Sequence, residues 1–309
     1  MTPSAINPLR IGTRSSPLAL AQAEMTKAAL LAAHGWDEAA ILLVPMLSSG
    51  DKVQDRPLAE IGGKALWTKE LERALLDREI DIAVHSMKDV ETVRAGIFGI
   101  VAMLPRADVR DRLIGAESIA ALPHSAKVGT SSPRRAAQLK ALRPDIATDS
   151  IRGNVATRLS KVENGEFDAT LLAAAGLARL GQGNIGTAIE TSEMLPAASQ
   201  GAIGIDCLVE RTEIAALMTP INHLPTFTCV MAERDFLEAL GGTCHSPVAA
   251  QASIDGGRIT LKAEILNEDG SEKQQGLSTF AATDTAAPVS LARQLLDAAS
   301  PALRALFEG

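Results

Sequence analysis

The chain has 309 residues, of which 46% are hydrophobic, and a net charge of -7 from 30 Lys+Arg against 37 Asp+Glu. This length allows two or three domains with apolar cores. The acidic balance excludes a global basic field for nucleic acid, so any anion must be held by local arginine clusters. The first residues show no apolar signal segment and no later run is long enough for a membrane span, so we expect a cytoplasmic protein without membrane or nucleic-acid partners.

Short apolar runs alternate with helix-like segments through the first two hundred residues. This alternation predicts an α/β fold with mainly parallel sheets. The first series has strands at 9–13, 41–47, 81–85 and 97–104, with helices at 17–33 and 69–77. A second series has strands at 127–130, 145–149 and 168–173, with helices from 133, from 154 and over 175–180.

After residue 224 the pattern changes to a helix at 228–240, strand-like runs at 247–254, 258–266 and 276–282, and a last helix from 288. This order is typical of an α+β domain. Joins are expected near 105–111 and 194–199, where proline and small or charged residues interrupt the pattern. If the run at 202–206 returns to the first sheet, domain 1 comprises 1–104 and 197–219, domain 2 comprises 105–196, and domain 3 comprises 220–309. A ligand is then expected in the cleft between the first two domains.

The segment DIAVHSMKDV at 81–90 ends an apolar strand with polar side chains. Open α/β sheets form their sites at this carboxyl edge, so Ser86, Lys88 and Asp89 are candidate site residues. Asp89 either stabilises a cation and moves protons or is only the ion-pair partner of Lys88. Adjacent strand residues point to opposite faces, which weakens the second reading. We interpret His85 as a hydrogen-bonded core histidine. The other histidines lie far apart in sequence, so no metal site is expected.

Arginines recur where helices should start. In GTSSPRR, Ser132 is a good N-cap and Pro133 suits the first helical position, so Arg134 and Arg135 fall in the first turn. Basic residues there oppose the helix dipole unless an anion binds. Together with the hydroxyls of Thr130, Ser131 and Ser132 they predict a carboxylate or phosphate cradle. The alternative is a solvated helix start.

The same arrangement recurs elsewhere. Arg14 ends a strand just before Ser16 caps the next helix, and Arg152 precedes a Gly-Asn turn with Arg158 on the following helix. Arg179 follows another strand. Each alone is an ordinary surface residue, but their repetition at strand ends predicts that several face one cleft.

Cys244 lies in the glycine turn ALGGTCHSP, whereas Cys207 and Cys229 fit buried apolar positions. An exposed thiol on such a turn is a nucleophile, a redox switch, a covalent attachment point or an inert side chain. The odd cysteine count and the absence of CxxC speak against disulfides and a zinc knuckle.

Seven strings occur in order along nearly the whole chain: RIGTRSSPLALAQA, GGKALWTKELE, DIAVHSMKDV, VGTSSPRR, SIRGNVATRLSKVENGEFDATLLAAAGLARLG, LPAASQGAIGID and GGTCHSP. Together they resemble the porphobilinogen deaminase (hydroxymethylbilane synthase) family. The third domain matches least, except around its cysteine.

This resemblance implies two lobes like those of type II periplasmic binding proteins plus a C-terminal α+β domain. It also implies a covalent dipyrromethane cofactor, carried as a thioether at Cys244, and a monomeric enzyme. Four porphobilinogen molecules are then condensed head to tail with loss of ammonia, and the linear hydroxymethylbilane (preuroporphyrinogen) is released by hydrolysis.

Site residues follow from the resemblance position by position. Asp89 is expected to stabilise cationic pyrrole species, and many guanidiniums to hold the carboxylates of the growing chain. The expected cofactor-binding residues are Ser86, Lys88, Thr130, Ser131, Ser132, Arg134, Arg135 and Arg158. The expected substrate-binding residues are Arg14, Ser16, Lys64, Arg152, Arg158, Arg179 and Gln200.

Two alternatives stay open at this point. A two-lobed anion-binding protein without catalysis predicts a secretion signal or a DNA-binding domain, neither of which is visible, and leaves Cys244 without a purpose. A cysteine-dependent transferase without a cofactor has His245 as its candidate base, but does not explain so many arginines.

Overall fold

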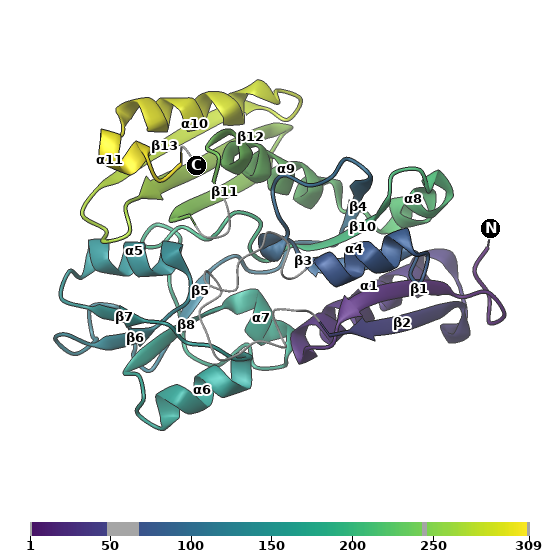
Figure 1. Ribbon diagram of the computed structural model, residues 1–309, viewed down its shortest axis with the longest axis horizontal. Helices are drawn as coiled ribbons and strands as arrows, with labels where there is room; N and C mark the ends of the chain where they lie inside the picture. The colour runs from purple at the N-terminus through teal and green to yellow at the C-terminus, as the bar shows by residue number, and fades with distance from the viewer. Residues whose placement is uncertain (1, 48–67, 243–245, 308–309) are drawn as a thin grey trace. The chain divides into compact units, whose positions relative to one another are not determined.

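The computed structural model describes residues 2–47, 68–242 and 246–307. The chain forms two compact units, shown with their elements in Figure 1. Unit 1 comprises Met1–Ala107 and Gly201–Phe227, and unit 2 comprises Asp108–Gln200 and Thr228–Gly309. The domain boundaries expected from the sequence stay a prediction.

Unit 1 is built on a five-stranded sheet in the order β2-β1-β3-β10-β4. Its strands are β1 (Leu9–Arg14), β2 (Ile41–Met46), β3 (Ile82–Ser86), β4 (Phe98–Met103) and β10 (Ile203–Leu208). Its helices are α1 (Pro17–His34), α4 (Lys69–Leu76) and α8 (Thr212–Met218), with short 3-10 helices η1 (Glu38–Ala40), η2 (Met87–Asp89) and η3 (Thr219–Ile221).

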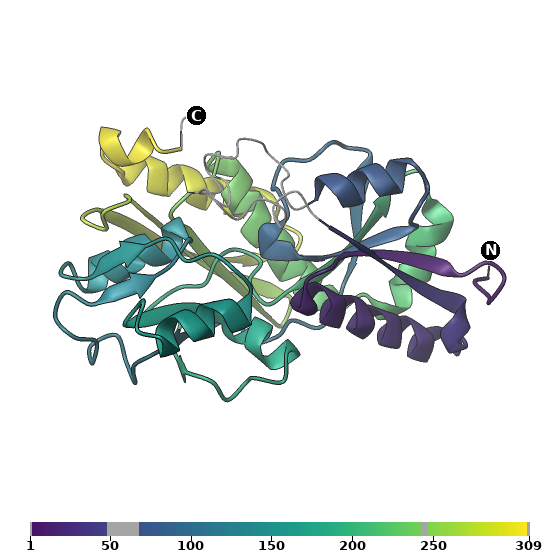
Figure 2. The same ribbon diagram turned by 60° about the horizontal axis from the view of Figure 1, so that its bottom comes forward.

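Helices cover both faces of this sheet. Along β3, Ile82 and Val84 join an apolar cluster with α1, whereas Ala83 joins a separate cluster with α4. Alternate strand residues point to opposite faces, which explains why this strand is apolar throughout. Figure 2 shows α1 running along the sheet.

The sheet is mixed. β1 pairs in parallel with β2 and β3, but β10 pairs antiparallel with both β3 and β4. The strand at 203–208 therefore does return to the first sheet, after the chain has formed part of unit 2. Only β10 runs against the other four strands described, so the expectation of a mainly parallel sheet fails at this one strand.

The first sheet of unit 2 has the order β7-β6-β8-β5-β9. β6 pairs in parallel with β7 and β8, and β5 pairs antiparallel with β8 and β9, so the pairing directions repeat those of unit 1. The strands are β5 (Asp111–Ile114), β6 (Lys127–Gly129), β7 (Ala147–Asp149), β8 (Ala169–Ala173) and β9 (Thr187–Ala188). The helices are α5 (Pro133–Leu142), α6 (Val155–Glu163) and α7 (Ala174–Arg179).

Unit 2 also holds a three-stranded antiparallel sheet of β11 (Val248–Asp255), β12 (Arg258–Leu266) and β13 (Lys273–Ala281). It packs in one apolar cluster with α9 (Leu224–Ala239) and α10 (Ala286–Ala298), and α11 (Pro301–Arg304) follows. The predicted α/β class with a C-terminal α+β domain is confirmed. In the described parts of the chain, no helix has the length and apolar character needed to cross a membrane.

Candidate functional site

A pocket of about 60 Å³ opens in unit 1 at the carboxyl ends of β1 and β3. Four predicted site residues line it: Arg14, Ser16, Ser86 and Asp89. Arg14 ends β1, Ser16 caps α1, and Ser86 ends β3. Parallel strands place these ends at the same sheet edge, as the sequence predicted. We call this the Asp89 pocket.

The local structure at Asp89 differs from the expectation. β3 stops at Ser86, and Met87–Asp89 form a 3-10 helix, so the argument that Lys88 and Asp89 point to opposite faces of a strand is wrong. The half-buried Asp89 carboxylate makes no hydrogen bond or ion pair with another residue in the described ranges. It is therefore available to a ligand.

Two hydrogen bonds hold side chains that line the pocket. Gln22 Nε2 donates to Ser86 Oγ at 2.7 Å, which fixes the hydroxyl at the end of β3. His85 is buried and bonds through Nε2 to Asp206 Oδ1 at 2.9 Å, so its interpretation as a hydrogen-bonded core histidine is confirmed. Arg94 pairs with the other oxygen of Asp206 at 2.6 Å. Although burial alone would raise the pKa of Asp206, His85 and Arg94 hold it below its usual value.

In unit 2 the start of α5 has the predicted form. Ser132 is the N-cap and its hydroxyl accepts from the Arg135 N–H, while Pro133 occupies the first helical position. Ser131 Oγ donates to the Ile151 carbonyl at 2.8 Å, and Thr130 Oγ1 accepts from the Ser132 N–H at 3.2 Å. These hydroxyls therefore already shape the loop before the helix.

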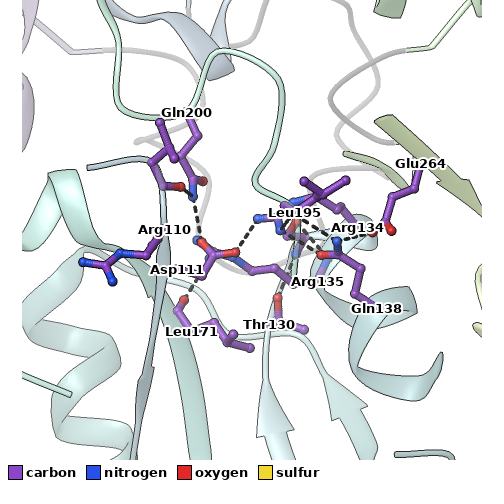
Figure 3. Close-up of polar contacts among 12 residues, drawn as sticks. Arg110, Asp111, Thr130, Arg134, Arg135, Gln138, Leu171, Leu195, Gln200 and Glu264 are labelled. Atoms are coloured by element: carbon purple, nitrogen blue, oxygen red, sulfur yellow. Dashed lines mark hydrogen bonds and ion pairs between the residues drawn. The ribbon is translucent and has the colours of Figure 1, made fainter. Parts of the chain in front are cut away.

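The two arginines of α5 are buried, at 3% and 6% exposure, so the solvated helix start is wrong. Both guanidiniums pair with one carboxylate on β5: Arg134 with Asp111 Oδ2 at 2.8 Å and Arg135 with Asp111 Oδ1 at 2.6 Å. Gln200 Nε2 also donates to Asp111 Oδ1, at 2.9 Å. Figure 3 shows this group, which we call the Asp111 cluster.

Asp111 is ionised in this setting. Burial alone would raise its pKa, but the guanidiniums of Arg134 and Arg135 lie close enough to outweigh that effect and hold the pKa far below its usual range. The three groups together carry one net positive charge. The cluster thus combines two helix-start arginines with an internal anion that the sequence analysis did not identify.

The remaining predicted arginines also lie in unit 2. Arg158 Nε donates to the Gly153 carbonyl at 3.0 Å, at the Gly-Asn turn before α6. Arg152 lies in the same turn, and Arg179 is the last residue of α7. Burial lowers the pKa of Arg179 to about 10, so it stays protonated at neutral pH.

Lys64 and Cys244 lie outside the described residues. Cys207 and Cys229 are buried, as predicted, and burial raises the pKa of the Cys207 thiol to about 11. The residues that the sequence analysis missed are Asp111, Gln22, Asp206, Gln138 and Glu264. Two of them gave a signal in the sequence: Asp206 is a carboxylate within the apolar run IGIDCL, and Asp111 stands just before the short apolar pair Leu113 and Ile114.

Comparison with protein families identifies the chain. Residues 9–216 match the family model described as porphobilinogen deaminase, dipyromethane cofactor binding domain. Residues 227–297 match the model of the porphobilinogen deaminase C-terminal domain. The first match contains the Asp89 pocket and the Asp111 cluster.

Two individual relatives agree with these family matches. The porphobilinogen deaminase of Sphingopyxis alaskensis is 56% identical over 97% of both chains, and that of Paracoccus denitrificans is 50% identical over 87% of both. Among solved structures, the periplasmic aliphatic sulphonate binding protein SsuA of Escherichia coli has a TM-score of 0.39 at 16% identity, covering 75% of this chain and 70% of its own. That similarity is distant, whereas the family matches span the chain. The chain belongs to the porphobilinogen deaminase family.

Proposed function

We propose that the protein condenses four porphobilinogen molecules head to tail, with loss of ammonia, on a dipyrromethane cofactor held as a thioether at Cys244. The linear hydroxymethylbilane is then released by hydrolysis. The family matches support this reading over a two-lobed binding protein without catalysis. The observation that carries the proposal within the site is the half-buried Asp89 carboxylate, which shares its pocket with Arg14 and has no partner among the described residues.

The described residues fit a cofactor with carboxylate side chains. The Nε atoms of Arg134 and Arg135 are buried without a hydrogen-bond partner in the described chain. A buried, unsatisfied donor of a charged group is costly, and a carboxylate is its natural acceptor. The two arginines, with the hydroxyls at the start of α5, would hold the cofactor's acidic groups.

When bound, the cofactor supplies the pyrrole carbon to which the first porphobilinogen is joined. The protein's own part is electrostatic. Asp89 stabilises positive charge that develops on the pyrroles, and it needs no rearrangement because no cation among the described residues is paired with it. Arg14, Arg152, Arg158, Arg179 and Gln200 are proposed to hold substrate carboxylates and the growing chain, together with Ser16 and Lys64. We also propose a monomer that works in the cytoplasm.

The mass of the purified protein tests this function directly. Intact mass should exceed the polypeptide by two linked pyrrole units, and a Cys244→Ser variant should lack that excess. Cys207→Ser is the matched control, because that thiol is buried inside the first sheet and should leave the excess unchanged. A bare polypeptide mass that persists after porphobilinogen is added would overturn the proposal.

A further inference from the structure

We propose that Asp111 is a positioning residue for cofactor loading: it holds Arg134 and Arg135 as one pre-formed receptor for a carboxylate. This inference rests on the proposed function, because it takes the two arginines as holders of the cofactor's acidic groups. Asp111 itself, fully buried on β5 and paired with two guanidiniums, would touch no ligand.

Asp111 fixes both arginines through its two carboxylate oxygens. The two oxygens of the Asp111 carboxylate are each bound to a different guanidinium, at 2.8 and 2.6 Å. Gln200 Nε2 adds a bond to the same oxygen as Arg135 and also donates to the Val109 carbonyl at 2.7 Å. The carboxylate therefore cannot rotate without breaking a charge-assisted bond. Its plane sets the relative orientation of both arginines.

Each guanidinium is also held by hydrogen bonds at its second terminal nitrogen. Arg134 Nη1 donates to Gln138 Oε1 and to the Leu195 carbonyl, both at 2.8 Å, and Arg135 Nη1 donates to the Leu171 carbonyl at 2.8 Å. Gln138 in turn donates to Glu264 on β12. Figure 3 shows these contacts converging from several elements. Two fixed nitrogens define the plane of a guanidinium, so both are pre-oriented.

Both guanidiniums keep N–H groups that no hydrogen bond uses among the described residues. A guanidinium carries five N–H groups. Arg134 makes three hydrogen bonds and Arg135 two among the described residues, and both Nε atoms are buried without a partner. Native proteins leave few polar groups buried and unpaired, so two such donors on neighbouring arginines call for a specific explanation. The unused donors on a pair of fixed arginines indicate a receptor awaiting an anion.

The charge of Asp111 reduces the repulsion between the two guanidiniums. Two buried guanidiniums bound to one carboxylate would repel each other strongly if that carboxylate were neutral. With Asp111 ionised, the group keeps a single net positive charge, which one incoming carboxylate neutralises. Asp111 thus allows both arginines to stay buried and side by side before the cofactor binds.

Cofactor loading of Asp111→Asn tests the inference. The full-length chain is produced in cells that make no porphobilinogen, porphobilinogen is added, and intact mass is followed with time. Asn has nearly the same shape but lacks the charge, and we expect loading to slow by about tenfold or more, as for loss of a charge-assisted hydrogen bond.

Asp81→Asn is the matched control. Asp81 is also a buried carboxylate between two arginines, with Arg10 at 2.9 Å and Arg211 at 3.5 Å, but it lies in unit 1 outside the Asp89 pocket. The Asp81→Asn variant should have a lower melting temperature than wild type but should load the cofactor at the wild-type rate. If Asp111→Asn loads at the wild-type rate, or if both variants slow loading in proportion to their loss of stability, the positioning role is overturned.

A second variant covers the case in which Asp111→Asn does not fold. Asp111→Glu keeps the charge but displaces the carboxylate by one methylene, so it should fold and still load slowly; loading at the wild-type rate would overturn the inference. Arg135→Leu separates this inference from the proposed function. A fully loaded Arg135→Leu would refute the arginine's role in cofactor binding, whereas an unloaded Arg135→Leu beside a normally loaded Asp111→Asn would refute only the inference.

Discussion

The Asp89 carboxylate is suited to catalysis because no described residue neutralises its charge. It is half buried, lies at the end of a 3-10 turn, and makes no ion pair with a described residue. Removing its charge should therefore cost the fold little, since no internal partner is lost. It should cost catalysis much, since the charge faces the pocket.

Asp89→Asn is the corresponding prediction. Turnover of porphobilinogen should fall by about 100-fold or more, the usual effect of losing one electrostatic stabiliser of a transition state. The melting temperature and the mass excess of the cofactor should stay close to wild type. Asp89→Glu, which keeps the charge, should recover part of the rate. Normal product formation by Asp89→Asn would refute the assigned role.

The sequence predicted Arg14, Ser16, Ser86 and Asp89 of the Asp89 pocket and Arg134, Arg135 and Gln200 of the Asp111 cluster, but not Asp111 itself. Strand ends, N-cap serines and first-turn arginines are local signals, so Ser16, Ser132 and Arg134 could be placed from neighbouring residues alone. Asp111 lies 23 residues before Arg134 and meets it only through the pairing of β5 with β8. Such a tertiary contact leaves no periodic trace in the sequence.

At the scale of elements, the apolar runs predicted the long strands and helices well, but not the reversed direction of β10 and β5. Strand periodicity is the same in both directions, so nothing local showed that β10 and β5 run antiparallel to their neighbours. β5 and β9, with four and two residues, are too short to give a pattern. β10 and β5, the strands that run against their neighbours, both lie next to points where the chain passes between its two units.

The strand β10 supports the turn that carries Asp89. Gly204 pairs with His85 on β3, and the fully buried Met87 packs where a side chain at Gly204 would lie. A Cβ at this position would overlap Met87 Sδ and lie 2.7 Å from its Cγ. Met87 also donates its N–H to the Ala202 carbonyl at 3.1 Å. A side chain at 204 would therefore force the buried Met87 side chain to shift and disturb the packing of η2 against β10.

Gly204→Ala should displace this turn. We expect a loss of about 1–3 kcal/mol in stability from overpacking, together with a fall in turnover per folded molecule, because Lys88 and Asp89 move with Met87. Gly99→Ala on the adjacent strand β4 is the control, since its Cβ would only approach Val209 Cγ2 to 3.2 Å. Thermal melts and turnover of both variants, corrected for folded protein, provide the measurement. Equal turnover in the two variants would contradict the proposed support of Asp89 by Met87.

At the scale of the whole molecule, each unit keeps buried carboxylates ionised by pairing them with cations. Asp81 and Asp206 do so in unit 1 and Asp111 in unit 2, and in each case the partners outweigh burial and lower the pKa. The net charge of -7 does not show which carboxylates are paired inside the protein. That distribution decides how the protein responds to acid.

The pKa of Asp206 makes this response testable. Its folded pKa lies below the usual 3.8, so the folded state holds the proton less readily than the unfolded chain. The stabilisation is therefore fully present above about pH 4 and is lost as the pH falls through the folded pKa. In Asp206→Asn this contribution is absent at every pH. We expect the variant to melt well below wild type at about pH 7, because His85 and Arg94 lose their anion, and the gap to narrow below about pH 4. A gap that stays constant from about pH 7 down to about pH 3 would mean that Asp206 stabilises the unit by packing rather than by its charge.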